Sequence, residues 1–118
     1  MKKELHLVRE FHEKFHAGIQ ETPANIGIDR ATFRYNLIKE ELEEYIPSVE
    51  KNDVPNIAKE LADILYAVYG TVIEHGLQDK IEAIFAEVHR SNMSKSYHEL
   101  KMIKGDGYIE ADTKKYFT

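Results

Sequence analysis

Apolar residues recur along most of the chain at the three- and four-residue spacings of amphipathic helices. The pattern predicts four helices. They run from Leu5 to a stop at Gly18, from Ala31 to about Tyr45, from Asn56 to about His75, and from about Ile81 to about Lys95. No stretch alternates apolar and polar residues as a half-buried strand does, and residues 96–118 have no clear period. We therefore expect an all-α fold, an antiparallel bundle of about four helices with a loop-rich C-terminal tail.

Residues that commonly begin or end helices separate these segments. They are Asp29, Pro47, Asn52 or Asp53 before Pro55, Gly76, and the pair Asp79 and Glu82, which resembles a capping box. The stretches 21–28 and 48–56 are predicted as connections. A chain of 118 residues suits one compact core, so residues 1–118 are predicted to form a single domain, with a helical core over 1–95 and a tail over 96–118.

The composition of the chain excludes several classes of site and of partner. Cysteine is absent, which excludes disulfides and thiolate metal sites and suits a reducing cytoplasm. We see no secretory signal after Met1, and no segment approaches the roughly 20 apolar residues that cross a membrane. The net charge of −5 argues against non-specific binding to nucleic acid. A nucleotide ligand is still compatible with this charge, because a metal ion can balance the phosphates.

Two acidic clusters are the main chemical feature of the sequence. The first contains Glu40, Glu41 and Glu44, and the second contains Glu60 and Asp63. Glu41 and Glu44 are three residues apart, as are Glu60 and Asp63, so each pair shares a helix face. If the two helices pack side by side, four carboxylates converge and require a cation, and Mg²⁺ and Mn²⁺ prefer such oxygen ligands. The alternative is a solvated acidic surface, which is common for charge runs.

Small residues continue the stripe of the second acidic cluster. Ala67 and Gly70 leave room either for a ligand or for close helix packing. A glycine inside a helix costs about 1 kcal/mol relative to alanine, so something is expected to require Gly70. Arg34 precedes the first cluster by about one and a half helical turns. It could pair with a carboxylate, but we favour a plain surface position.

The segment His12-Glu13-Lys14-Phe15-His16 matches the H-E-x-x-H pattern of zinc peptidases, in which two histidines bind zinc. The match is short, and the third ligand and the strand edge that such enzymes use are not predicted. We therefore favour two surface histidines flanking a core Phe15. A zinc peptidase is kept as a third hypothesis, which a zinc titration would expose.

Taken in order, Glu40-Glu41-x-x-Glu44 and Glu60-x-x-Asp63 resemble the E-E-x-x-E…E-x-x-D signature of the all-α nucleoside triphosphate pyrophosphohydrolases. That superfamily includes MazG-like proteins, dimeric dUTPases and phosphoribosyl-ATP pyrophosphohydrolases. The resemblance extends over Phe11-His12-x-x-Phe15, residues 60–71, the N-M-S-K run 92–95 and the tail segment 104–108. The chain departs from the pattern after Tyr108, where the prolines that are often found are absent.

The resemblance implies a MazG-like fold and Mg²⁺-dependent hydrolysis, with Mn²⁺ possible, of a nucleoside triphosphate between its α and β phosphates, in nucleotide-pool sanitation. The implied metal ligands are Glu41, Glu44, Glu60 and Asp63, the implied catalytic residues are Glu40 and Glu41, and the implied substrate contacts are Asn92, Lys95, Lys104 and Tyr108. The base of the substrate, and which of Glu40 and Glu41 positions the attacking water, stay open. A homodimer or higher homo-oligomer is also implied. The alternative is a non-catalytic nucleotide-binding or helical interaction module.

Overall fold

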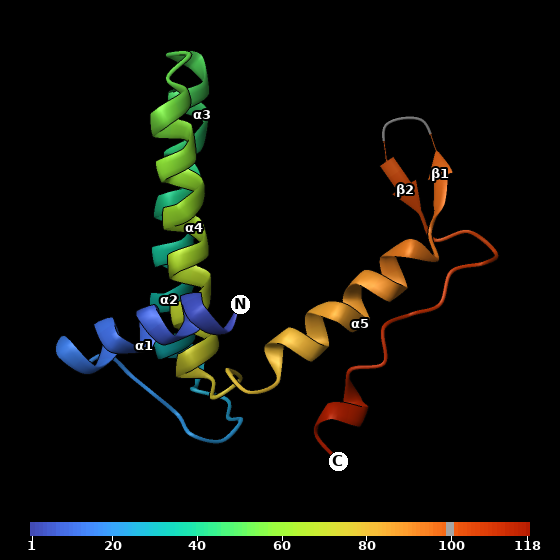
Figure 1. Ribbon diagram of the computed structural model, residues 1–118, viewed down its shortest axis with the longest axis horizontal. Coiled ribbons are helices and arrows are strands. Elements are labelled where there is room, and N and C mark those ends of the chain that lie inside the picture. The colour runs from blue at the N-terminus through green and yellow to red at the C-terminus, as the bar shows by residue number, and fades with distance from the viewer. Residues whose placement is uncertain (99–100) are drawn as a thin grey trace. The chain divides into compact units, whose positions relative to one another are not determined.

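The computed structural model describes residues 1–98 and 101–118, and it is mostly helical (Figure 1). Its elements are α1 (Lys2–Lys14), α2 (Ile28–Glu43), α3 (Tyr45–Glu50), α4 (Val54–Glu74), α5 (Ile81–Met93), β1 (Ser96–His98), β2 (Lys101–Ile103) and a 3-10 helix η1 (Lys114–Tyr116). The chain forms two compact units, Met1–Gln78 and Asp79–Thr118. The predicted fold class, all-α with a loop-rich C-terminal end, is confirmed. No helix among the described residues is long and apolar enough to cross a membrane.

In the N-terminal unit, α4 is the helix against which the others pack. Figure 1 shows α2 and α3 running along α4, while α1 crosses it. The buried apolar core is small and is formed by Leu5 and Val8 of α1 with Val72 and Ile73 of α4. The middle of α4 is less covered, since its apolar residues Leu61 and Leu65 are about half exposed. The unit therefore leaves much apolar helix surface uncovered.

Both ends of α4 are set by the local sequence. The side chain of Asp53 accepts a hydrogen bond from the backbone N–H of Asn56 at 3.2 Å, which confirms the predicted N-cap. At the other end, Gly76 has a φ of +68°. The N–H of Gly76 donates to the carbonyl of Ile73, and that of Leu77 donates to the carbonyl of Val72, which is the Schellman arrangement that glycine favours.

Four predicted helix boundaries are wrong. The helix α1 ends at Lys14, before the predicted stop at Gly18. Asp29 lies in the first turn of α2, whose N-cap is Gly27 with a φ of +84°, and a carboxylate in that turn still favours the helix dipole. Pro47 does not end the helical region but lies inside α3, in the first turn, where proline is tolerated. The expected capping box does not form. The N-cap of α5 is Lys80, which follows a turn over residues 78–80, and its side chain makes no capping hydrogen bond.

Arg34 is buried rather than on the surface, so our preferred interpretation of this residue was wrong. It lies 3.0 Å from the carboxylate of Glu74, which is also buried. Its guanidinium donates hydrogen bonds to the carbonyl of Ala67 and the hydroxyl of Thr71 as well. Arg30 completes the network with two hydrogen bonds to Glu74. These contacts tie α2 to about two turns of α4.

The Arg34 side chain also explains Gly70. A Cβ at position 70 would collide with the guanidinium of Arg34 and would lie 2.9 Å from Nε2 of His12. Because glycine has no Cβ, the side chains of Arg34 and His12 can both lie against α4 at this position. The reason for glycine at position 70 is therefore neither of the two expected ones, which were room for a ligand and close packing of helix backbones.

In the C-terminal unit, the chain that follows α5 folds back on that helix. Glu87 is buried, accepts two hydrogen bonds from Arg90, and accepts a third from the backbone N–H of Asp112 at 2.9 Å. These bonds lower the pKa of Glu87 to about 2, with Arg90 as the largest cause. The hydroxyl of Ser94 bonds the backbone of Ile109. The tail is thus held to one side of α5.

A small antiparallel hairpin in this unit was not predicted. Ser96 pairs with Ile103, Tyr97 with Met102, and His98 with Lys101. The two strands span only three residues each, which is too short for an apolar–polar alternation to be recognised in the sequence. Position 105 also needs glycine, because a Cβ there would collide with the side chain of Ser96.

Candidate metal and nucleotide site

Three of the predicted metal ligands meet between α2 and α4. Glu41 of α2 and Glu60 and Asp63 of α4 each offer a carboxylate oxygen, and these oxygens all lie within 4.8 Å of one another. We call these residues the acidic trio. They meet because α2 packs along α4 and the three-residue spacing puts Glu60 and Asp63 on the side of α4 that faces α2. Carboxylate oxygens in such a group suit a hard divalent cation.

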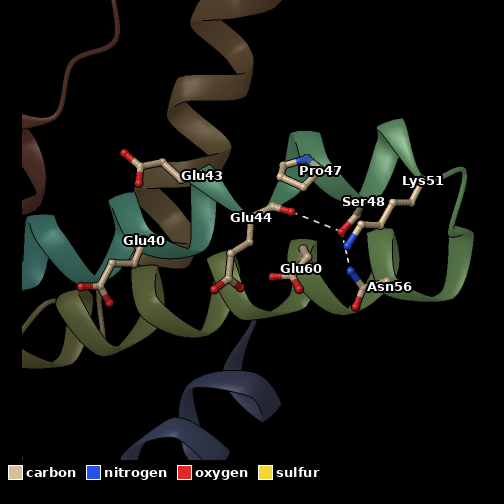
Figure 2. A pocket seen from close by; sticks show the side chains of 8 residues that line it. All are labelled: Glu40, Glu43, Glu44, Pro47, Ser48, Lys51, Asn56 and Glu60. Atoms are coloured by element: carbon tan, nitrogen blue, oxygen red, sulfur yellow. Dashed lines mark hydrogen bonds between the residues drawn. The ribbon is translucent and has the colours of Figure 1, made fainter.

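Glu44 and Glu40 lie beside the acidic trio, at a hollow of about 470 Å³ between the α2–α3 segment and the start of α4. Figure 2 shows the residues that line it, which are Glu40, Glu43, Glu44, Pro47, Ser48, Lys51, Asn56 and Glu60. Ser48 is buried at one end, where it donates to the carbonyl of Glu44 and accepts a hydrogen bond from Asn56. Glu40 is exposed. The predicted acidic residues thus occupy one connected region.

The electrostatics of this region call for a positive charge. Glu60 is only 5% exposed, and its Oε2 has no hydrogen-bond partner among the described residues. Burial and the neighbouring carboxyl of Glu44 raise the pKa of Glu60. Burial, followed by the charges of Asp63 and Glu60, raises the pKa of Glu41. A buried carboxylate without a partner is unfavourable, so a bound cation would stabilise these groups in their ionised form.

Lys59 is a member of this region that the sequence analysis missed. Its Nζ lies 2.8 Å from Oδ2 of Asp63 and 3.8 Å from Oε1 of Glu60. Asp63 raises the pKa of Lys59, with a further contribution from Glu60. The spacing was a usable signal, because a lysine four residues before an aspartate on a helix is placed to pair with it.

A second hollow, of about 240 Å³, adjoins the acidic trio on the side of α1. It is lined by Phe11, His12, Arg34, Leu37, Glu41, Asp63, Tyr66 and Ala67. The ring of Phe11 meets that of Tyr66 edge-on, with centroids 5.6 Å apart. Aromatic walls next to carboxylates suit a ligand that has one flat apolar part and one charged part.

The two histidines of the H-E-x-x-H segment have different surroundings. His12 is buried, and its Nδ1 lies 2.9 Å from the carbonyl of Gly18, which can only accept, so Nδ1 carries the proton. His16 follows the end of α1 with a φ of +58° and is exposed. Zinc binding by this motif needs both histidines on one face of a helix, and this pair does not meet that requirement. The preferred interpretation was wrong in detail as well, because His12 is buried and Phe15 is exposed.

The four predicted substrate contacts lie in the C-terminal unit. Asn92 is exposed on the last turn of α5, and Lys95 follows that helix, with its backbone N–H donating to the carbonyl of Asn92. Nζ of Lys104 lies 5.3 Å from the ring centroid of Tyr108. The hydroxyl of Tyr108 is 3.3 Å from that of Ser91, which brings this part of the tail to α5. The structure thus brings Lys104 and Tyr108 together.

Comparison with known families identifies the class to which this chain belongs. The phosphoribosyl-ATP pyrophosphohydrolase profile matches residues 8–92, which contain the five acidic residues of the two predicted clusters. The match defines the class of the protein as a MazG-like all-α nucleotide pyrophosphohydrolase. Within that class, the chain belongs to the phosphoribosyl-ATP pyrophosphohydrolase family. Membership supports a pyrophosphohydrolase activity on a nucleotide-like substrate. A comparison with proteins of curated function gives no match.

Proposed function

We propose that the protein hydrolyses a (deoxy)nucleoside triphosphate between its α and β phosphates, giving the monophosphate and pyrophosphate, with a role in nucleotide-pool sanitation. The observation that carries this proposal is the acidic trio, whose oxygens lie within 4.8 Å of one another beside an aromatic-lined hollow. The family match supports the type of reaction, and the arrangement of carboxylates supports its dependence on a metal.

The donor set fits a divalent cation, Mg²⁺ or Mn²⁺, and not zinc. Glu41, Glu60 and Asp63 offer only oxygen, which hard cations prefer, and the unpartnered Oε2 of Glu60 is a buried polar atom that a cation would satisfy. Glu44 is proposed as the fourth ligand, because its carboxyl lies close enough to Glu60 to raise the pKa of that residue. When bound, the ion would neutralise phosphate charge, orient the phosphates and lower the pKa of neighbouring water.

The remaining steps are assigned to residues of this chain. Glu40, outside the acidic trio but in the adjoining hollow, is proposed to orient the attacking water and take its proton as the water oxygen bonds to the α phosphorus. The bond from the α phosphorus to the bridging oxygen breaks, and pyrophosphate leaves with the bonding electrons. Asn92, Lys95, Lys104 and Tyr108 are proposed to contact the phosphates or the sugar, the lysines as point charges.

The hollow beside α1 is proposed to receive the base. Phe11 and Tyr66 provide aromatic surface for it, and Leu37 adds an apolar contact. His12 also lines this hollow, and its Nδ1 is held by a hydrogen bond to the carbonyl of Gly18.

Phosphoribosyl-ATP is the second candidate substrate, favoured by the name of the matching family. A panel of nucleoside triphosphates and phosphoribosyl-ATP, assayed for pyrophosphate release with Mg²⁺, separates the two. We expect turnover of at least one common or non-canonical triphosphate to exceed that of phosphoribosyl-ATP. The reverse order would assign the second substrate. No pyrophosphate from any substrate, with nucleotide binding retained, would favour a non-catalytic nucleotide-binding module.

The dependence on a metal is tested in the same assay. Chelation of divalent ions should abolish turnover, Mg²⁺ or Mn²⁺ should restore it, and Zn²⁺ should not, because no histidine or thiolate belongs to the proposed ligand set. Turnover that survives exhaustive chelation contradicts the proposed site.

A further inference from the structure

Lys59 is in direct contact with the acidic trio without belonging to it. Its Nζ lies 2.8 Å from Oδ2 of Asp63 and 3.8 Å from Oε1 of Glu60, so the ammonium touches two of the three carboxylates. The side chain is nevertheless 65% exposed. The ammonium group is therefore held by its hydrogen bond to Asp63 and by the charges of the carboxylates, with little packing that would keep it in place.

We propose that Lys59 is a counter-ion of the metal-free site that the divalent cation displaces, and that the displaced ammonium then contacts the phosphates of the substrate. The inference rests on the proposed metal site. It adds a residue that exchanges between two anionic partners, the acidic trio when the metal is absent and the phosphates when both metal and substrate are bound.

The first half of the exchange follows from electrostatics. A divalent ion held by Asp63 and Glu60 needs the oxygens that the ammonium contacts, and at such short range two positive charges repel each other strongly. Exposed lysine pairs are weak, and the lysine stem is flexible, so the side chain can leave at little cost. The presence of Lys59 should therefore weaken metal binding when no substrate is present.

The second half follows from the length of the lysine side chain. Its backbone is fixed on α4, adjacent to Glu60 and one turn before Asp63, so the ammonium stays near the site after it has left the carboxylates. A triphosphate that approaches the metal brings several negative oxygens into the same region. A lysine ammonium, a mobile and strongly hydrated point charge, is suited to these oxygens.

The test compares Lys59→Gln with Lys39→Gln, a matched control. Lys39 also pairs with an acid four residues later, Glu43, at 3.8 Å, but neither of these residues belongs to the acidic trio. Both variants remove one positive charge from an exposed position. Mn²⁺ binding is titrated without nucleotide by calorimetry. We expect Lys59→Gln to bind Mn²⁺ roughly five- to tenfold more tightly than the wild type, and Lys39→Gln to change less than about twofold.

A second titration uses inorganic pyrophosphate in saturating Mg²⁺. Here the sign should reverse, with Lys59→Gln binding pyrophosphate several-fold more weakly and Lys39→Gln unchanged. Unaltered or weaker Mn²⁺ binding by Lys59→Gln overturns the counter-ion role. Tighter Mn²⁺ binding with unchanged pyrophosphate affinity overturns the phosphate contact and leaves the counter-ion role in place.

A third variant separates this inference from the proposed function. Glu41→Gln should lose most Mn²⁺ affinity if the acidic trio binds the metal. Wild-type affinity in Glu41→Gln would overturn the metal site and the role of Lys59 together. Lost affinity in Glu41→Gln, combined with no change in Lys59→Gln, would overturn the role of Lys59 alone.

Discussion

Arg34 and Glu60 are both almost fully buried, but their charges are satisfied to different degrees. Arg34 reaches the Glu74 carboxylate, a carbonyl and a hydroxyl on α4. Among the described residues, Glu60 pairs with the cation of Lys59 at 3.8 Å, and its Oε2 has no hydrogen-bond partner. Buried charges that are paired hold a structure together, whereas an incompletely paired one is a candidate for ligand binding. The first residue therefore acts in the fold and the second in the proposed chemistry.

At the acidic trio, Glu41→Gln or Asp63→Asn should lower pyrophosphate release by roughly 100-fold or more, because each removes a charged ligand of the metal. The metal-free variants should remain folded and become slightly more stable, since like-charge repulsion is relieved. Turnover and thermal unfolding in chelator, measured on the same samples, check both parts. Glu50→Gln, an exposed acid on α3, is the control and should retain activity. Near-normal turnover in either trio variant would remove that residue from the ligand set.

The raised pKa values of Glu41 and Glu60 imply a pH dependence of the metal-free protein. Between the usual glutamate pKa of 4.5 and these raised values, the folded state binds more protons than the unfolded state. The free energy of unfolding should therefore fall as the pH rises through this window, and this effect should be absent below about pH 4.5. Urea unfolding in chelator, from pH 4.5 to 7.5, measures the slope.

Glu60→Gln is the comparison that isolates this effect, because histidines titrate in the same range. The variant should show a shallower slope than the wild type. Saturating Mg²⁺ should reverse the contribution of these groups, since the metal binds their ionised form and is favoured by higher pH. Identical slopes in the wild type and in Glu60→Gln would show that the carboxylate does not titrate in this window.

Predictions for single residues depended on their spacing in the sequence, and spacing was sufficient to predict that three of the acids lie close together. Glu41, Glu60 and Asp63 converge because three-residue intervals on packed helices leave little choice of face. Arg34 was misjudged because its partner Glu74 lies 40 positions later, and no local pattern connects them. Lys59 was missed although its partner is only four residues away, because such lysine–acid pairs are common on solvated helix faces and do not by themselves mark a site.

At the scale of the elements, features that nearby residues determine were predicted well, as for α4, and features that depend on distant residues were not. Its predicted ends were close to the observed ones because a capping side chain and a glycine with positive φ act within a few residues. The helix α3 and the hairpin β1–β2 are too short for a period to develop, so the sequence did not predict them. Pairing with other parts of the chain, rather than propensity, selects such short elements.

The attachment of α2 to α4 depends on Arg34, so Arg34→Met should lower the free energy of unfolding by about 3 kcal/mol. Among the described residues, the variant leaves the buried Glu74 with Arg30 as its ion-pair partner, and it removes one hydrogen bond from the Ala67 carbonyl and one from the Thr71 hydroxyl. Urea unfolding measures the change. Arg9→Met is the control, because Arg9 pairs with Glu13 and Glu21 at the surface and should contribute less than about 1 kcal/mol. Equal losses in the two variants would contradict the role given to burial.

At the scale of the whole molecule, the amount of exposed apolar helix surface is the main observation. On α1 and α4 of the N-terminal unit, Leu7, Phe11, Leu61, Leu65 and Tyr66 are each at least two-fifths exposed. On α5 of the other unit, Phe85 and Val88 are similarly exposed. Small chains often complete their cores by association, and we propose that this one forms a homodimer or a larger homo-oligomer.

Light scattering at micromolar concentration should give a mass at least twice the 13.7 kDa of one chain. A mass near 13.7 kDa would exclude a stable dimer. If the site is shared between subunits, a mixture of Glu41→Gln and Lys95→Ala should recover activity that neither variant has alone, because one kind of mixed site has both wild-type residues. No recovery, in a mixture shown to exchange subunits, would mean that each chain works alone.

The contact of the Arg34 side chain with Gly70 restricts which residues can occur together at these positions in related proteins. A side chain at position 70 is excluded only while a long basic residue at position 34 and the imidazole of His12 occupy that space. Relatives that have lost both the arginine and the histidine would be free to carry alanine or serine at position 70, while an acid at position 74 would still pair with an arginine at position 30. Positions 12, 34 and 70 are therefore expected to be inherited as a set. An alignment of relatives in which these three positions vary independently would contradict this coupling.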